Sequence, residues 1–140
     1  MVLLKTTESR EAAARNPNTP PEILEVLATD KDDSVRWWVA LNPNTSPKVL
    51  ELLGTDKEYW VRQAVARNPI TPPKVLELLA TDKSSYVRYS VACNQNTPPK
   101  VLELLSADKD YTVRYRISRN PNTPHYIKKY FKIQRIMTLP

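Results

Sequence analysis

The chain contains very little glycine, cysteine or histidine. Its 140 residues include one glycine, Gly54, one cysteine, Cys93, and one histidine, His125. A single glycine excludes the glycine-rich loops that hold nucleotide phosphates. One cysteine allows no internal disulfide, and together with one histidine it supplies neither a zinc site nor a Cys–His nucleophile pair. We therefore predict no catalytic residue, no bound metal and no cofactor, and we predict that the chain is not an enzyme.

Long apolar runs are also missing. No stretch approaches the roughly 20 apolar residues that a membrane helix needs, and the apolar start at residues 1–4 is too short for a signal peptide. The lone cysteine is compatible with a reducing compartment. These absences predict a cytoplasmic protein that has no membrane partner.

Proline is abundant, and its positions are periodic. Thirteen prolines would suit a disordered chain, but 41% of the residues are hydrophobic, which predicts a folded one. The prolines recur within a unit that repeats every 26 residues. The whole chain, 1–140, is therefore predicted to be one repeat domain. It consists of a half-repeat at 1–15, repeats at 16–41, 42–67, 68–93 and 94–119, and a basic capping helix at 120–140.

Each repeat begins with a short predicted helix. Its body in the second repeat is Val49–Leu53, with the pattern Val-Leu-Glu-Leu-Leu. This wide apolar arc predicts that neighbours surround the helix on several sides. The threonine before the helix, Thr19 in the first repeat, is predicted to cap its N-terminus, and Glu22 is predicted to complete a capping box there. The same threonine recurs at Thr45, Thr71, Thr97 and Thr123.

A second predicted helix follows in each repeat. Asp56 is expected to accept the backbone N–H groups at its start. Val61 and Val65, four residues apart, define its buried stripe, and Ala66 allows another helix to pack closely. Asn68 then ends the helix, because asparagine tolerates the left-handed conformation that usually requires glycine. The equivalent asparagines are Asn16, Asn42, Asn94 and Asn120.

A single repeat is too small to fold alone, because it buries few side chains for the backbone that it must order. Stacking of successive repeats buries their faces against one another. The predicted fold class is all-α, and the predicted architecture is an α-solenoid of helix-pair repeats. Residues 124–137 depart from the repeat pattern, and we predict that they form a basic, polar-faced cap.

The stretch Val65–Leu79, Val-Ala-Arg-Asn-Pro-Ile-Thr-Pro-Pro-Lys-Val-Leu-Glu-Leu-Leu, resembles the leucine-rich repeat variant family. The family's pattern recurs here over about residues 10–131. The resemblance implies a right-handed superhelix of paired helices, in which the second helix of each pair is an α-helix or, in part, a 3₁₀-helix. The unit of this chain is longer than the family's usual one, which favours a full α-helix. The founding member of the family has a cysteine cluster for an iron–sulfur centre, and this property does not carry over, because Cys93 is the chain's single cysteine.

The spacing from Asp56 to Val61 and Arg62 also resembles HEAT-type repeats, in which the second helix lines the concave face. By that resemblance, four arginines form a row along one side of the groove. They are Arg36, Arg62, Arg88 and Arg114. Either the row binds phosphates or an acidic peptide, or each arginine pairs with an aspartate of its own repeat or the next and holds the stack together. The equal number of aspartates, Asp30, Asp56, Asp82 and Asp108, favours the second interpretation.

The positions that differ between repeats lie around the second helix and are rich in tryptophan and tyrosine. Stacking does not dictate these residues, so they are candidates for a protein interface or for base stacking. The alternative is that they cover the edges of the repeat core. The predicted binding residues are the four arginines of the row with Trp37, Trp60, Tyr86, Tyr89 and Tyr115.

Three functions remain open from the sequence. The first is a non-enzymatic scaffold that binds a protein or peptide. The second is binding of nucleic acid through the basic C-terminal half, since residues 120–140 have four basic and no acidic side chains. The third is base release from DNA, by analogy with HEAT-like alkylpurine glycosylases, but their active-site pattern is not identifiable in this chain.

Overall fold

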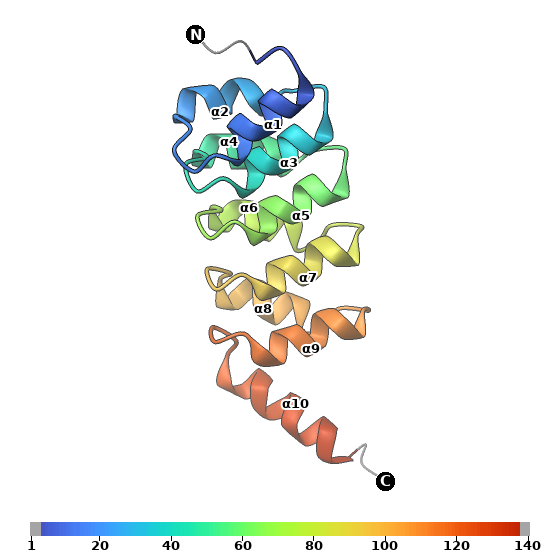
Figure 1. The fold of residues 1–140 in the computed structure, drawn as a ribbon. Coiled ribbons are helices and arrows are strands. Elements are labelled where there is room, and N and C mark those ends of the chain that lie inside the picture. The colour runs from blue at the N-terminus through green and yellow to red at the C-terminus, as the bar shows by residue number, and fades with distance from the viewer. Residues whose placement is uncertain (1–3, 138–140) are drawn as a thin grey trace.

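A computed structural model describes residues 4–137 of the chain. Within these residues the protein has ten helices and no strand, which confirms the all-α class (Figure 1). The helices are α1 (Thr7–Arg15), α2 (Pro21–Leu27), α3 (Asp33–Leu41), α4 (Pro47–Leu53), α5 (Tyr59–Arg67), α6 (Pro73–Leu79), α7 (Ser85–Cys93), α8 (Pro99–Leu105), α9 (Tyr111–Arg119) and α10 (His125–Met137). None of them is long and apolar enough to cross a membrane.

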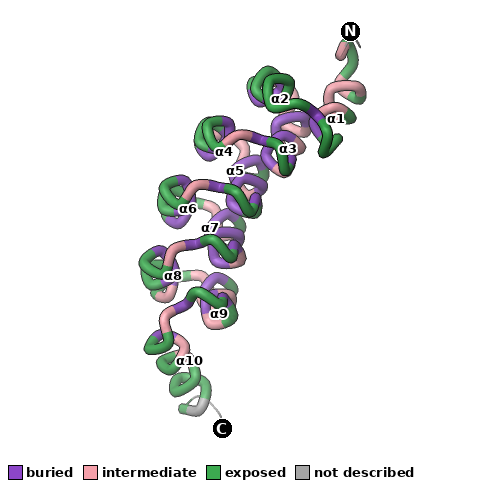
Figure 2. The backbone as a smooth tube through the Cα atoms, turned by 90° about the vertical axis from the view of Figure 1, so that its left-hand side faces the viewer, coloured by how far each residue is buried: buried purple, intermediate pink, exposed green. Residues whose placement is uncertain are grey.

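The helices form two rows that run the length of the array. The odd-numbered helices α1 to α9 pack directly on one another, and each even-numbered helix from α2 to α8 packs against the two odd-numbered helices beside it. The array bends gently, with the odd-numbered row on the inside of the bend (Figure 2). The first and last helices lie at opposite ends (Figure 1), so the repeats stack in line as a solenoid. The right-handedness of the superhelix and the likeness to HEAT repeats stay predictions.

The inner row contains the buried stripe that the sequence predicts. Val61, Val65 and Ala66 of α5 are fully buried. The equivalent residues Val35, Val39 and Ala40 of α3, and Val87, Val91 and Ala92 of α7, are fully buried too. The odd-numbered helices are α-helical throughout, and no 3₁₀-helix occurs in the described part of the chain. The full α-helix that the repeat length favours is therefore confirmed.

The apolar arc of the even-numbered helices is narrower than predicted. In α4, Val49, Leu50 and Leu53 are buried, but Leu52 is 51% exposed. Three residues at the same place in the other repeats are also more than half exposed: Val26, Leu78 and Leu104. An even-numbered helix packs against two odd-numbered helices, and Val75 of α6 also lies beside Gly54 at the end of α4. Neighbours therefore cover more than one side of the helix, but the fourth position of the predicted apolar arc faces solvent.

The threonines before the even-numbered helices do not cap those helices, which corrects a second prediction. Pro20 is the N-cap residue of α2, so this helix has no side-chain cap, and Glu22 completes no capping box. The Thr71 hydroxyl instead donates a hydrogen bond to the carbonyl oxygen of Val65, 2.6 Å away in the preceding helix. Thr19, Thr45, Thr97 and Thr123 bond the same way to the carbonyl six residues earlier. Because the threonine lies one position before the N-cap, its hydroxyl gives a second hydrogen bond to a carbonyl in the last turn of the preceding helix, which for Val65 also accepts the N–H of Asn68.

The asparagines after the odd-numbered helices are not left-handed, which corrects a third prediction. Asn68 has φ −67° and ψ 125°, an extended backbone. No residue in the described part of the chain has a positive φ. Pro69 follows Asn68 and favours the extended region, but Asn94 precedes Gln95 and has the same backbone, φ −70° and ψ 125°, so the proline alone does not set this conformation. The asparagine therefore has another role, which its side chain reveals below.

Helix α10 is the last helix of the described residues and is basic, and its role as a cap stays a prediction. Ile127 is buried and Phe131 is half-buried against the core. Most of the remaining side chains are exposed, including Lys129, Lys132 and Arg135. Helix α10 has 13 residues, whereas the equivalent helix α8 has 7 and is followed by a turn into α9. No inner helix follows α9 within the described residues, so the end of the inner row is open there.

Candidate binding surface

Arginines of the inner row join each repeat to the next. Arg36 is 7% exposed, and its Nε and Nη2 donate to the two carboxylate oxygens of Asp56 at 2.7 and 3.1 Å. Its Nη1 donates to the backbone carbonyls of Asp30 and Lys31 in its own repeat, at 2.8 and 3.2 Å. Nη1 of the guanidinium thus binds within its own repeat, whereas Nε and Nη2 make a bidentate contact to the next repeat.

The same arrangement recurs along the stack. Arg62 pairs with Asp82 and Arg88 with Asp108, with Nε to Oδ2 distances of 2.6 and 2.7 Å. Arg10 of the half-repeat pairs with Asp30 and also with Asp32. These arginines therefore pair with an aspartate of the next repeat and join the stack, which is the second of the two interpretations of the arginine row.

The aspartates of this ladder are held in their ionised form. Burial of the Asp56 carboxylate tends to raise its pKa, but hydrogen bonds from Arg36 and from the Glu58 backbone N–H together outweigh this effect. The pKa of Asp56 therefore lies below its usual value. Three equivalent carboxylates have a lowered pKa for the same reasons: Asp30, Asp82 and Asp108. Asp56 thus accepts one N–H, that of the N-cap residue Glu58, but no side chain caps α5, so its predicted role at the start of the second helix is confirmed only in part.

We expect acid to destabilise the stack. The folded-state pKa of each ladder aspartate is lower than the unfolded value of about 3.9. The stabilisation is therefore present above that pH and is lost as the pH falls through the folded pKa values. The urea midpoint, followed by circular dichroism, should fall steeply below about pH 4. Asp82→Asn should decline less steeply over that range, and a wild-type midpoint that stays constant in strong acid would contradict the assignment.

The asparagines that end the inner helices form a second ladder. Asn68 is 2% exposed, and its Nδ2 donates to the carbonyl oxygens of Ala40 and Asn42 in the preceding repeat, at 2.8 and 3.3 Å. Its Oδ1 accepts from the backbone N–H of Ile70 at 3.0 Å. Asn42, Asn94 and Asn120 make the same three bonds. The amide thus closes its own turn and binds the repeat before it.

The predicted binding residues fall into two groups. Arg36, Arg62 and Arg88 lie beneath the surface, where their guanidinium groups are bonded within the stack. Arg114 is half-buried at the open end of the row. The predicted aromatic residues lie instead on the inner face, by which we mean the solvent-facing side of α3, α5, α7 and α9.

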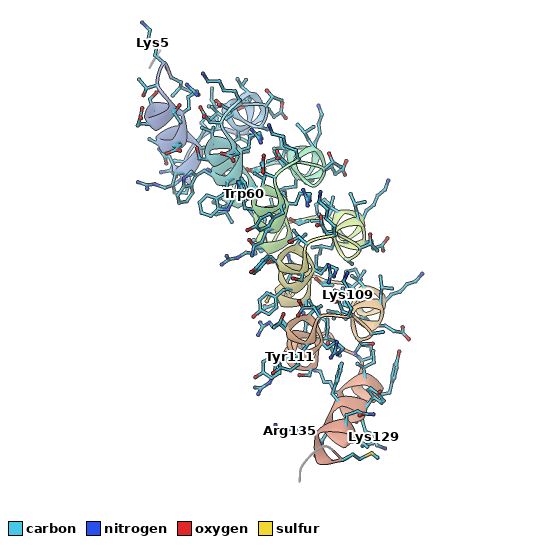
Figure 3. All side chains as sticks on the ribbon, turned by 90° about the vertical axis from the view of Figure 1, so that its right-hand side faces the viewer. Lys5, Trp60, Lys109, Tyr111, Lys129 and Arg135 are labelled. Carbon is cyan, nitrogen blue, oxygen red and sulfur yellow. The ribbon has the colours of Figure 1, made fainter. Side chains whose placement is uncertain are left out.

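Aromatic rings are exposed along this inner face. The Tyr59 ring stacks on Tyr86 of the next repeat, with centroids 5.8 Å apart, and meets Trp60 edge-on at 5.2 Å. Tyr86 is 63% exposed, and Tyr89 and Tyr115 are also exposed. Figure 3 shows Trp60 and Tyr111 on the side of the array that the odd-numbered helices form.

The first repeat departs from this exposed row. Trp37 is half-buried rather than exposed, and it packs against the core. Its ring meets that of Trp38 edge-on, with centroids 4.6 Å apart. The Arg15 guanidinium lies 5.4 Å from the centre of the Trp38 ring. Trp37 therefore fits the alternative that the variable aromatics cover the edge of the core, whereas the exposed tyrosines of later repeats do not.

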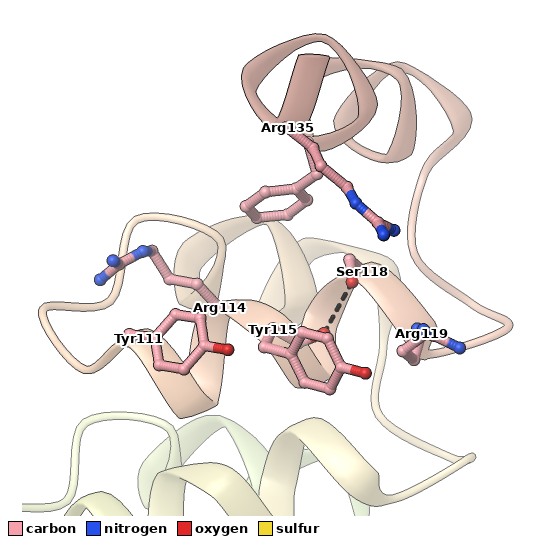
Figure 4. A pocket seen from close by; sticks show the side chains of 7 residues that line it. Tyr111, Arg114, Tyr115, Ser118, Arg119 and Arg135 are labelled. Atoms are coloured by element: carbon pink, nitrogen blue, oxygen red, sulfur yellow. Dashed lines mark hydrogen bonds between the residues drawn. The ribbon is translucent and has the colours of Figure 1, made fainter. Parts of the chain in front are cut away.

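A groove opens between α9 and α10, and the sequence did not predict it. It has a volume of about 490 Å³ and is lined by Tyr111, Arg114, Tyr115, Ser118, Arg119, Phe131 and Arg135 (Figure 4). Arg119 lies 5.4 Å from the centre of the Tyr115 ring. Only Arg114 and Tyr115 were among the predicted binding residues. Tyr115 and Arg119 lie four residues apart and therefore on one helix face, a sequence signal that could have added Arg119 to the predicted binding residues. No sequence signal indicated where α10 would lie.

No group of three or more His, Cys, Asp or Glu residues that could hold a metal occurs in the described part of the chain.

The cysteine Cys93 is half-buried beside Tyr89 in a shallow depression that Arg67 and Arg116 also line. Arg116 Nε is buried there without a hydrogen-bond partner in the described structure. The inner face therefore presents aromatic rings and arginines, a combination typical of protein recognition surfaces.

Comparison with known proteins identifies similar repeats. The sequence model described as "Leucine Rich Repeat Variant domain" matches residues 8–69, and the one described as "Leucine rich repeat variant" matches residues 59–84. The chain is similar to a solved structure described as "a leucine-rich repeat variant with a novel repetitive protein structural motif", with 24% identity and a TM-score of 0.40. The match covers 91% of this chain and 62% of that one, so the chain spans less than two thirds of its solved relative. No curated protein matches the chain.

Proposed function

Because the chain belongs to the leucine-rich repeat variant family, we propose that it is a non-enzymatic repeat scaffold. Its inner face binds an acidic segment of another protein. The observation that carries this proposal is the exposed aromatic row. Tyr59, Trp60 and Tyr86 join two successive repeats by ring contacts and remain open to solvent. Tyrosine and tryptophan in such positions contribute much of the binding energy at protein interfaces.

The charge of the inner face supports an acidic partner. Arg67 and Arg119 are exposed at the C-terminal ends of α5 and α9, and Arg116 lies half-buried near them. The buried Nε of Arg116 has no hydrogen-bond acceptor in the described structure. That nitrogen is closed to solvent, so the charge offered to a partner comes from the exposed guanidinium groups, and complementary charge raises the rate and specificity of association.

Nucleic acid is the alternative ligand, because tyrosines and arginines also stack on bases. Three of the four arginines on which that hypothesis rested are bonded within the stack. Their charge is already neutralised by aspartate, so they offer little to phosphates. We therefore favour the protein segment and treat nucleic acid as an outcome of the test.

The test is a selection of displayed random peptides on the immobilised full-length chain. The enriched peptides are measured against Trp60→Ala/Tyr86→Ala and against Leu52→Ala/Leu78→Ala, a matched pair of truncations on the outer row. We expect acidic peptides, bound by the Trp60/Tyr86 variant at least about thirtyfold more weakly, since a hot-spot side chain contributes about 2 kcal/mol. Binding to the Leu52/Leu78 variant should be unchanged.

Three outcomes would overturn the proposal. The first is that no peptide is enriched, and the second is that the enriched peptides bind both variants as well as the wild type. The third is a salt-sensitive electrophoretic shift of single-stranded DNA or RNA that acidic peptides cannot displace, which would assign the surface to nucleic acid.

A further inference from the structure

Arg114 repeats half of the ladder geometry. Its Nη1 donates to the backbone carbonyls of Asp108 and Lys109 at 2.6 and 3.0 Å. Arg88 makes the same pair of bonds to Asp82 and Lys83 one repeat earlier. The Arg114 guanidinium is therefore held by its own repeat as the other ladder arginines are held by theirs.

The other half of the geometry is missing at Arg114. In Arg36, Arg62 and Arg88, Nε and Nη2 bind the aspartate that lies 20 residues further along the chain. Position 134, which is that distance from Arg114, is glutamine, and it lies within α10. Among the described residues the ion pairs of the ladder end at Arg88 and Asp108. Nε and Nη2 of Arg114 therefore bind no carboxylate group of the described residues.

The surroundings of Arg114 suit an acidic ligand. A second cavity of about 700 Å³ adjoins the groove and shares Tyr111, Arg114, Phe131 and Arg135 with it. No aspartate or glutamate lines either cavity. Figure 4 shows Arg114 turned toward one end of the groove and Arg119 toward the other, with Tyr111 and Tyr115 between them.

We propose that the groove between α9 and α10 binds an aspartate or glutamate side chain of an acidic segment, whose carboxylate takes the place of the missing ladder aspartate on Arg114. The neighbouring residues of that segment lie over Tyr111 and Phe131, and a second acidic residue reaches Arg119. This inference rests on the proposed function and specifies one subsite of the inner face. The preorganised fork favours a carboxylate, because bidentate arginine–carboxylate bonds are directional as well as strong.

The test uses a short fluorescein-labelled peptide in which aspartate alternates with phenylalanine, and its counterpart with asparagine in place of aspartate. Binding to the full-length chain is followed by fluorescence anisotropy. Arg114→Lys keeps the charge but loses the fork, and Gln134→Glu places an internal carboxylate in the same cavity. Arg15→Gln is the matched control, since it removes one positive charge at the opposite end of the array. Circular dichroism confirms that each variant is folded.

We expect the aspartate peptide to bind the wild type and Arg15→Gln equally, and both groove variants about tenfold more weakly, the factor that loss of one charge-assisted hydrogen bond gives. The inference is overturned if Arg114→Lys binds as the wild type does, if the asparagine peptide binds equally well, or if phosphate displaces the peptide more strongly than acetate at equal ionic strength. If peptides selected on the inner face still depend on Trp60 and Tyr86 in that case, the proposed function stands and this subsite alone is wrong.

Discussion

Replacing Arg62 by alanine should lower the free energy of unfolding by about 3–5 kcal/mol, the usual cost of removing one partner of a buried ion pair. The Arg62 side chain is 9% exposed and that of Asp82 is 8% exposed. The substitution removes both bonds to Asp82 and also the bonds to the carbonyls of Asp56 and Lys57, at 2.7 and 3.1 Å. A buried carboxylate then remains without its counter-charge. Urea unfolding followed by circular dichroism measures the change.

Two further variants separate the ion pair from other effects. Arg67→Ala removes an exposed arginine from the same helix α5, and it should change the free energy of unfolding by less than about 0.5 kcal/mol. Asp82→Asn in the Arg62→Ala background removes the stranded charge, so the double variant should be destabilised by less than the sum of the single variants. A loss below about 1 kcal/mol for Arg62→Ala would contradict a structural role, because surface ion pairs contribute that little.

The position of Arg62 in the middle of the stack adds a second consequence. Among the described residues the main helix contacts lie within a repeat or join it to the next one, so the stability of the array depends on the interface between successive repeats. Weakening the Arg62–Asp82 interface should let the two halves unfold separately. A broader transition or a second one is therefore expected for this variant, whereas Arg67→Ala should retain the wild-type slope.

The sequence was sufficient to predict the repeat and its buried stripe, because a period of 26 residues and the Val-x₃-Val spacing are local patterns. It also reduced the arginine row to two interpretations. It could not choose between them, since the choice depends on whether Asp82 lies nearer to Arg62 or to Arg88, which only the stacking distance decides. The same limit explains Leu52, whose exposure depends on how far apart the even-numbered helices lie.

The candidate site was predicted less completely. Trp60, Tyr86, Tyr89 and Tyr115 could be identified because they vary between repeats that are otherwise alike, and their role in binding stays a prediction. The groove at Arg114 could not, because it forms where α10 departs from the repeat pattern, and no periodic signal describes the angle of that helix. Sequence periodicity therefore predicts the scaffold and, through the positions that vary, the aromatic row, whereas the groove lies where the periodicity ends.

The asparagine ladder shows how a residue type can suggest the wrong mechanism. Asparagine after a helix is typical of a left-handed stop, but the backbone of Asn68 is extended and its side chain is 2% exposed. Its amide bonds span 28 and 26 residues, to Ala40 and Asn42. Such contacts leave no local pattern. The backbone is equally extended at Asn94, which Gln95 rather than a proline follows. The carbonyl of Ala40, near the end of the preceding inner helix, lacks an intrahelical partner, which explains the need for a donor.

We expect Asn68→Ala to lower the free energy of unfolding by about 3–4 kcal/mol, because a buried group left without its hydrogen bond costs about 1–3 kcal/mol. The change strands the carbonyl of Ala40 and the backbone N–H of Ile70 together, whereas the carbonyl of Asn42 keeps its bond from the Thr45 N–H at 3.2 Å. Asn18→Ala is the matched control, since Asn18 is exposed and only its backbone N–H is bonded. It should change the free energy of unfolding by less than about 0.5 kcal/mol in urea unfolding.

Asn68→Asp separates the donor from the shape of the side chain. Aspartate keeps the oxygen that accepts from Ile70 but replaces the Nδ2 donor by a second oxygen. That oxygen would face the carbonyls of Ala40 and Asn42, so at neutral pH the loss should be at least as large as for alanine. Lowering the pH should recover part of it, because a protonated carboxyl can donate one bond. If Asn68→Asp is tolerated at neutral pH, the amide donor does not hold successive repeats together, and the ladder is only a turn motif.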